Sequence, residues 1–395
     1  MTRVLELSAQ AAGGVRAHIR QVSQLLAKDG HQVLLAGPSN VISPADDAVS
    51  GACLRTYQID IGARPSRADL KALHQLKQLA ATAQVIHAHG LRAGALAVLA
   101  VKRLPAAKRP RVVVTLHNLP VGSAPTRLVG QALHLVVVKG ADYVLTVSPD
   151  LLEKAKQLGL KAGEIAVVPA PARGCADCGC MDRAAQPEIS QASAQSSHAG
   201  SGVGTGSGVD AGSGYGASSA AGSGATPCVL TIARLAPQKG LDLLLEAATL
   251  IKQRGLNFTW LVAGDGPLKA QLNQQITAAD LPVKLLGRRE DIGALLAQAD
   301  VVVQTSYWEG QPLTLREAMQ AGRAVVATDV GGSAYTLAGC GQLVEPQAGP
   351  IADAVVAVIS DPKRRETLEA ASRAAVAKIP GETQLREQLD RVLKL

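Results

Sequence analysis

The sequence predicts an α/β protein with two domains, each a parallel sheet covered by helices on both faces. Apolar runs typical of strands alternate with helical stretches throughout residues 3 to 170, and again from 228 to about 360. The chain has 395 residues, 47% of them hydrophobic, which is too long for one ordinary core and enough for two. Between the halves, residues 173 to 227 are rich in Ser, Ala and Gly and have little to bury.

The first half opens with a strand at residues 3 to 8 and a helix that runs to about residue 29. Gly13 and Gly14 occupy the turn between them. Two glycines at such a turn let a backbone approach a ligand closely and leave amides free for oxygen atoms. The same pair also fits a plain turn in any α/β fold. The chain has no Gly-x-Gly-x-x-Gly here, which argues against an NAD-type site.

Three histidines lie near the ends of predicted strands in this half. His87 and His89 follow Val85-Ile86, and His117 follows the apolar run 112 to 116. Ligands gather outside the carboxyl ends of strands in open parallel sheets, so these positions are expected to face a cleft. We expect at most one of His87 and His89 to face a given side of the sheet, and we interpret each as a structural histidine. The three lack the ligand spacing of a zinc motif.

The second half opens with a buried strand around residues 230 to 232, and a helix begins near Gly240. Arg234 and Lys239 lie in the loop between them. Fixed cations in such a loop suit a leaving group that gains negative charge in the transition state. A solvated pair in a surface loop is the alternative.

The segment 305 to 318 carries the most functional information, and it reads Thr-Ser-Tyr-Trp-Glu-Gly-Gln-Pro-Leu-Thr-Leu-Arg-Glu-Ala. Pro312 is expected as the first residue of a helix, so that the amides of Leu313 and Thr314 form an anion cradle. Glu309 precedes this helix and Glu317 lies within it. A carboxylate beside a phosphate site can accept hydrogen bonds from the vicinal hydroxyls of a ribose. Glutamate early in a helix also occurs simply because it complements the dipole.

This arrangement resembles the signature of the family 4 glycosyltransferases of the GT-B fold, in which two glutamates separated by seven residues bind a sugar nucleotide. The segment 317 to 328 and the pair Gly331-Gly332 are similar to the same family's helix, strand and glycine turn. The resemblance implies two Rossmann-like, doubly wound domains that face each other across a cleft. It also implies transfer of a sugar from a nucleoside diphosphate to an acceptor hydroxyl, with retention at the anomeric carbon.

The resemblance assigns roles to the chemically distinctive residues. Glu317 would hold the ribose diol, and Glu309 would bind or orient the donor sugar. Arg234 and Lys239 would contact the donor diphosphate, and His117 would touch the reacting sugar. The remaining donor-site residues are backbone amides and a loop that meets the nucleobase: Gly13, Gly14, Leu313, Thr314, Gly287 and Arg288.

No metal or other cofactor is expected. The cations of the site would do the work of a metal ion, and the chain contains no Asp-x-Asp, the pattern by which many metal-dependent glycosyltransferases hold their cation. Cys175, Cys178 and Cys180 stand at the start of the low-complexity segment, where the nearby His198 lies in glycine-rich sequence. A zinc site needs four ligands held by folded surroundings, so we do not interpret these cysteines as one.

We divide the chain into four parts. Residues 1–172 form an acceptor-side domain, 173–227 a disordered linker or insertion, and 228–360 a nucleotide-sugar domain. Residues 361–395 form C-terminal helices that, in the family, cross back to the first domain. No apolar run suits a signal peptide or a membrane span, so the cytoplasm is the expected location.

Charge is uneven along the chain. Residues 1–172 carry 20 Lys and Arg against 10 Asp and Glu, whereas residues 173–395 carry 20 against 22. The basic half suggests an anionic or lipid-linked acceptor and peripheral contact with an anionic membrane, although basic helices are also ordinary solvated faces. Aromatic residues make up 2% of the chain, which argues against nucleic acid because base stacking needs aromatic platforms.

The expected product is a cell-envelope glycan, a glycolipid or a small glycoside. Two other classes stay open. A GT-B epimerase or phosphorylase would need no acceptor alcohol or would consume phosphate. A non-catalytic homologue that binds nucleotide or scaffolds a complex would bind donor without turnover.

Overall fold

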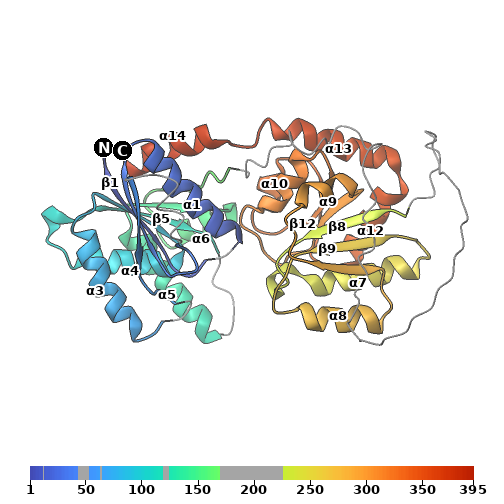
Figure 1. The fold of residues 1–395 in the computed structure, drawn as a ribbon, viewed down its shortest axis with the longest axis horizontal. Coiled ribbons are helices and arrows are strands. Elements are labelled where there is room, and N and C mark those ends of the chain that lie inside the picture. The colour runs from blue at the N-terminus through green and yellow to red at the C-terminus, as the bar shows by residue number, and fades with distance from the viewer. Residues whose placement is uncertain (12, 43–52, 63–64, 119–123, 170–225) are drawn as a thin grey trace, which may run out of the picture.

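The computed structural model describes residues 1–11, 13–42, 53–62, 65–118, 124–169 and 226–395. Two α/β units lie side by side along the long axis of the molecule (Figure 1), and each is built on a parallel sheet. The predicted fold class is therefore confirmed. The linker, apart from residues 226 and 227, and Cys175, Cys178 and Cys180 lie outside the described residues.

The first unit is a seven-stranded sheet with the order β3-β2-β1-β4-β5-β6-β7. The order reverses between β1 and β4, and in doubly wound sheets ligands bind outside the carboxyl ends of the strands at such a reversal. The strands are β1 (Arg3–Ser8), β2 (Gln32–Gly37), β3 (Leu54–Gln58), β4 (Val85–His89), β5 (Arg111–Leu116), β6 (Tyr143–Thr146) and β7 (Gly163–Ile165).

Helices cover both faces of this sheet, as expected for a doubly wound domain. One apolar core packs under α3 (Ala68–Ala80), α4 (Leu91–Lys102) and α5 (Ala124–Gly140). The opposite core packs under α1 (Gly13–Lys28) and α6 (Pro149–Gln157). The 3-10 helix η2 (Ala106–Lys108) precedes β5. Because both faces are buried, the central strands read as nearly continuous apolar runs.

The second unit is a six-stranded sheet with the order β10-β9-β8-β11-β12-β13. Its strands are β8 (Cys228–Ile232), β9 (Thr259–Ala263), β10 (Val283–Gly287), β11 (Val301–Gln304), β12 (Ala324–Thr328) and β13 (Gln342–Val344). Buried Phe258 and Trp260 fill the core on one face, where the indole of Trp260 donates to Thr231 Oγ1 at 3.0 Å. A buried indole needs such a partner, so this bond helps to fix the ring.

Helices again form a layer on each face of the second sheet. The face with Trp260 is covered by α7 (Leu241–Gln253), α8 (Lys269–Ala278) and α12 (Ala348–Ser360). The other face is covered by α9 (Ile292–Gln298), α10 (Leu313–Gln320), α11 (Ser333–Leu337) and α13 (Pro362–Val376). The short 3-10 helix η3 (Pro237–Lys239) stands between β8 and α7.

The last helix, α14 (Glu382–Leu393), lies on the first unit beside α1 (Figure 1). Its buried Leu385 and Leu389 join the core there. Polar contacts fix its register: the Gln388 side chain accepts from the Val167 amide at 2.7 Å, and Arg111 Nε donates to the Val392 carbonyl at 2.8 Å. The C-terminal helix therefore ties the two units together.

A loop between β11 and α10 forms a second connection between the units. The Trp308 indole donates to Asp150 Oδ2 at 2.8 Å, and the Gln311 amide donates to the Ala166 carbonyl at 2.7 Å. A Cβ added to Gly310 would lie 2.5 Å from Val147 Cγ2, so the loop can approach this closely only with glycine there. In the part of the chain that the structure describes, no helix is long and apolar enough to cross a bilayer.

Candidate active site

The glycine turn of the first unit meets the start of α10. A Cβ added to Gly14 would lie 3.1 Å from Leu313 Cδ1, so the two turns touch across the units. Gly13 adopts φ +57°, which favours glycine. The first amides of a helix have no acceptor within it, and they point out of its start. Two elements predicted to bind anions thus lie against each other.

Pro312 differs slightly from its predicted position. The helix begins at Leu313, and Pro312 is its N-cap residue, with an extended ψ of 108° and no side-chain cap. Pro312 is therefore not the first helical residue, because its backbone has not yet turned into the helix. The amides of Leu313 and Thr314 still stand at the helix start, where the dipole favours an anion.

Lys239 and Glu309 form an ion pair beside this helix start. Lys239 Nζ lies 2.5 Å from Glu309 Oε1, and Ser306 Oγ donates to the same oxygen at 2.6 Å. Both residues line a small cavity with Thr314 and the ends of β8 and β11. The two strands are neighbours in a parallel sheet, so their following loops meet although Lys239 and Glu309 are 70 residues apart.

The other predicted donor-site residues lie at the same edge of the second sheet. Glu317 is half-buried on α10, about one turn beyond Leu313. Gly287 ends β10 with φ +69°. Arg234 and Arg288 are exposed in the loops that follow β8 and β10. The structure thus joins Lys239, Glu309 and the start of α10 closely, while the two arginines stand in solvent.

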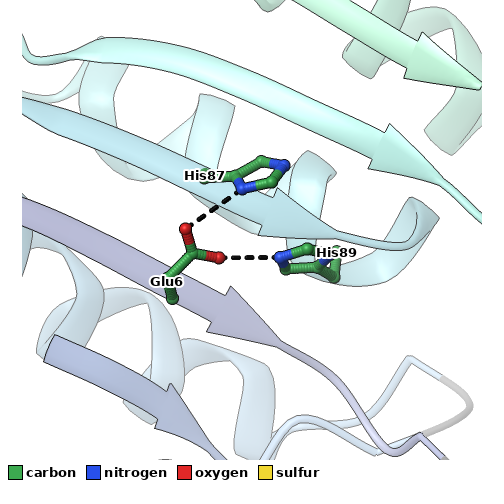
Figure 2. Close-up of side chains that lie close together, drawn as sticks. All are labelled: Glu6, His87 and His89. Carbon is green, nitrogen blue, oxygen red and sulfur yellow. Dashed lines mark hydrogen bonds and ion pairs between the residues drawn. The ribbon is translucent and has the colours of Figure 1, made fainter. Parts of the chain in front are cut away.

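His117 belongs to a buried polar cluster centred on Glu6 of β1. Figure 2 shows the Glu6 carboxylate between His87 and His89 of β4. Glu6 Oε1 lies 3.1 Å from His87 Nδ1, and Oε2 lies 2.7 Å from His89 Nε2. The prediction that at most one of these histidines faces a given side is wrong. Residues two apart on a strand point to the same face, so both side chains reach Glu6.

The cluster extends from His89 to His117. His89 Nδ1 lies 3.2 Å from His117 Nε2, and the two rings stack with centroids 5.5 Å apart. On the other side, His87 Nε2 lies 2.8 Å from Thr115 Oγ1. Among the described residues, Glu6, His87 and His89 are the one group of possible metal ligands that lie close enough together to hold an ion.

Burial and neighbouring charges decide the protonation of this cluster. Burial raises the pKa of Glu6, but the electrostatic interaction with His87 and the hydrogen bonds of His87 and His89 outweigh it and hold that pKa at about 2. His18 of α1 adjoins the cluster, with its ring edge-on to those of His89 and His117. Burial, helped by the other histidines, lowers the pKa of His18 to about 3 and that of His117 well below 6.5. Burial also lowers the pKa of His89. At neutral pH the carboxylate is therefore charged, and His18, His89 and His117 are neutral.

Arg316 of α10 is a site candidate that the sequence did not reveal. It is 2% exposed, and its Nη2 donates to Gln311 Oε1 at 2.5 Å. Its Nε and Nη1 are buried without a hydrogen-bond partner among the described residues, and burial lowers its pKa to about 10. Gln311 precedes α10, so this guanidinium lies near the positive end of the helix, an unfavourable place unless an anion joins it. A lone arginine in a helix gives no sequence signal of burial.

We expect the free energy of unfolding to fall as the pH falls below 6.5. The pKa values of His18 and His117 are lowered in the folded state, so below pH 6.5 the unfolded chain binds protons that the folded chain does not bind. The stability present above pH 6.5 is thus lost on acidification, by up to about 1.4 kcal/mol per pH unit for each histidine. Urea unfolding at pH 7.5 and 5.5 measures this loss.

The His18→Gln variant should lose less stability between these two pH values than the wild type. The matched control is His74→Gln, because His74 is exposed on α3. That control should keep the wild-type difference. An unchanged difference in His18→Gln would show that His18 is not excluded from protonation in the folded state.

Both units match family models. Residues 13–171 match a glycosyl transferase 4-like domain, and residues 226–361 match glycosyl transferases group 1. The α-D-kanosaminyltransferase of Streptomyces kanamyceticus is 33% identical over 149 residues, which is 36% of this chain and 39% of that protein. The N,N'-diacetylbacillosaminyl-diphospho-undecaprenol alpha-1,3-N-acetylgalactosaminyltransferase of Campylobacter jejuni is 40% identical over 108 residues, 27% of each chain. These matches thus span well under half the length of each relative.

Solved structures resemble the whole chain. Anabaena HepE, crystallised with UDP and glucose, has a TM-score of 0.71 and 19% identity, and the match covers 100% of each chain. Sucrose-phosphate synthase from Thermosynechococcus elongatus has a TM-score of 0.73 and 19% identity over 100% of this chain and 98% of that one. With both family models matched in order, this chain belongs to the family 4 glycosyltransferases and has the GT-B fold.

Proposed function

We propose that the protein is a retaining hexosyltransferase that moves a sugar from a nucleoside diphosphate to an acceptor hydroxyl. The observation that carries this proposal is the contact between Gly14 and Leu313, beside the Lys239–Glu309 pair. Two helix starts, one from each unit, thus lie close together beside a lysine, and amides and a cation of this kind suit a diphosphate. Retention rests on the family likeness.

In this proposal, the diphosphate lies over the amides of Gly13, Gly14, Leu313 and Thr314. Lys239 and Arg234 neutralise the charge that grows on it as the sugar bond breaks. Arg316 adds a third cation, since two of its buried nitrogens lack hydrogen-bond partners in the described structure. These cations supply what a metal ion supplies elsewhere, so the mechanism requires none.

Carboxylates and a histidine hold the sugars of the donor. Glu317 accepts hydrogen bonds from the ribose diol, and the nucleobase meets Gly287 and Arg288. Glu309 orients the transferred sugar beside Lys239, with which it is already paired. His117, neutral and 7% exposed, contacts a hydroxyl of that sugar. Closing the units over the donor excludes water that would hydrolyse it.

The acceptor side is the basic first unit. We propose an acceptor hydroxyl on an anionic or lipid-linked molecule, in the cytoplasm or at the inner face of the membrane. Support comes from α3, which carries the exposed side chains of Lys71 and Lys77 and a Leu70 that is 73% exposed. The Campylobacter jejuni relative is named for a diphospho-undecaprenol acceptor, which is of this class.

A thermal-shift screen with UDP-glucose, GDP-mannose and ADP-glucose tests the donor. We expect one nucleotide sugar to raise the melting temperature more than its free sugar does, because a ligand at 100 times its Kd adds about 2.7 kcal/mol. Turnover of that sugar nucleotide with an alcohol acceptor is then measured. No shift with any of the three sugar nucleotides would contradict the proposal. A shift without turnover would favour a non-catalytic homologue, and turnover that consumes phosphate would favour a phosphorylase.

Glu317→Gln should weaken donor binding about tenfold to a hundredfold, because an amide presents one acceptor oxygen to the ribose diol in place of two. Isothermal titration with the nucleoside diphosphate selected by the screen measures the Kd. Glu366→Gln is the control, since Glu366 is exposed on α13 and should leave the Kd unchanged. Wild-type affinity in Glu317→Gln would refute the ribose assignment.

Arg316→Met should raise the melting temperature of the free protein while it weakens binding of the same diphosphate. The substitution removes a buried cation that has no carboxylate partner in the described structure, and replacing such a charge with an apolar side chain is often stabilising. Differential scanning calorimetry measures the melting temperature, and isothermal titration measures the Kd of the diphosphate. A loss of stability with unchanged affinity would show that Arg316 is structural.

A further inference from the structure

Glu6 is fully buried, and it has no part in the proposed donor site. Its two carboxylate oxygens are each bound by a different imidazole, from His87 and from His89 (Figure 2). A buried carboxylate is costly unless it is hydrogen-bonded, so this one is held in place by its two partners. One of those partners also contacts His117, the histidine assigned to the reacting sugar.

Proton positions along this chain of contacts follow from the charge of Glu6. A carboxylate only accepts hydrogen bonds, so His89 must carry a proton on Nε2. A neutral imidazole has one N–H, so His89 Nδ1 holds a lone pair. This lone pair lies 3.2 Å from His117 Nε2, so it accepts a hydrogen bond and Nε2 of His117 must carry the proton. His117 Nδ1 is then left with the lone pair of its own ring.

We propose that Glu6, acting through His89, fixes His117 in the tautomer that is protonated on Nε2, so that Nδ1 accepts a hydrogen bond from a hydroxyl of the donor sugar. The inference rests on the proposed function, because it takes the sugar to lie at His117. Glu6 is thus a positioning residue that touches no substrate. Glu6 thereby sets whether His117 Nδ1 is a hydrogen-bond acceptor or a donor, and so how the sugar hydroxyl must be oriented to bind.

The cluster has two arms that begin at Glu6: one runs through His89 to His117, and the other runs through His87 to Thr115. The second arm serves as an internal comparison. His87 donates from Nδ1 to Glu6, and its Nε2 lies 2.8 Å from the Thr115 hydroxyl. All four ring nitrogens of His87 and His89 and both carboxylate oxygens therefore have partners. A cation among these side chains would instead need lone pairs on His87 Nδ1 and His89 Nε2, which the hydrogen bonds to Glu6 use as donors.

Nuclear magnetic resonance of the full chain labelled with ¹⁵N-histidine tests the tautomers directly. Two-bond ¹⁵N–¹H spectra distinguish protonated from unprotonated ring nitrogens, and the His89→Gln and His117→Gln variants assign the signals. We expect His117 and His89 each to be protonated on Nε2 alone. A proton on His117 Nδ1, a mixture of its tautomers, or a bare Nε2 on His89, as a bound cation would give, would overturn the proposal.

Glu6→Met tests the consequence, because it keeps the side-chain volume but removes the acceptor. His117 should then populate both tautomers, and kcat should fall about tenfold to a hundredfold, the size of effect found for side chains that orient metal-binding histidines. The KM of the nucleotide sugar selected by the screen should change less than about twofold, since Glu6 does not contact the diphosphate. An unchanged His117 tautomer in Glu6→Met would refute the role of Glu6.

Thr115→Val is the matched control, because it breaks the arm through His87 and leaves the arm through His89 intact. It should preserve both the His117 tautomer and kcat. A change in either comparable to that of Glu6→Met would show general loosening of the core and would overturn the proposal. If Glu6→Met does not fold, the wild-type spectrum still decides. The spectrum is also independent of turnover, so a protein that binds none of the sugar nucleotides would refute the proposed function without altering the tautomer result.

Discussion

The contact between the Gly14 turn and the start of α10 is the constraint on which the rest of the site depends. Parallel sheets place the loops that follow their strands at one edge, and each unit contributes such an edge. A Cβ on Gly14 would lie only 3.1 Å from Leu313 Cδ1, so glycine lets this turn pack closely against the helix start. The loop at Trp308 and the crossing of α14 hold the units in this relation.

Buried polar groups in this molecule fall into two kinds with different consequences. Around Glu6 every facing oxygen and nitrogen has a partner, so the cluster is rigid and its proton positions are set. Arg316 and His18 are the opposite case, since each has a buried nitrogen without a hydrogen-bond partner among the described residues. Buried groups without hydrogen bonds lower the stability of the free protein. A ligand that supplies the missing charge or hydrogen bond removes this cost.

Several of the residues proposed for the site could be singled out from the sequence because their signals are local. The pair Glu309 and Glu317 is set by spacing along one helix start, and the glycines at 13 and 14 are set by one turn. Arg234 and Lys239 lie in one loop. The histidines were less predictable. His87, His89 and His117 were located near strand ends. Glu6, the partner that His87 and His89 share, lies 81 residues from His87 in sequence, and its strand is paired with β4 only in the sheet.

The sequence by itself determined the fold class, the family and the donor-site motifs, because periodicity, turn residues and motif spacing are properties of short segments. Tertiary structure alone decided which distant groups meet. It paired Lys239 with Glu309 across neighbouring strands, joined Glu6 to two histidines, and buried Arg316 with no carboxylate partner among the described residues. The physical reason is that burial, and with it protonation and hydrogen-bond supply, depends on what packs against a side chain and not on its neighbours in sequence.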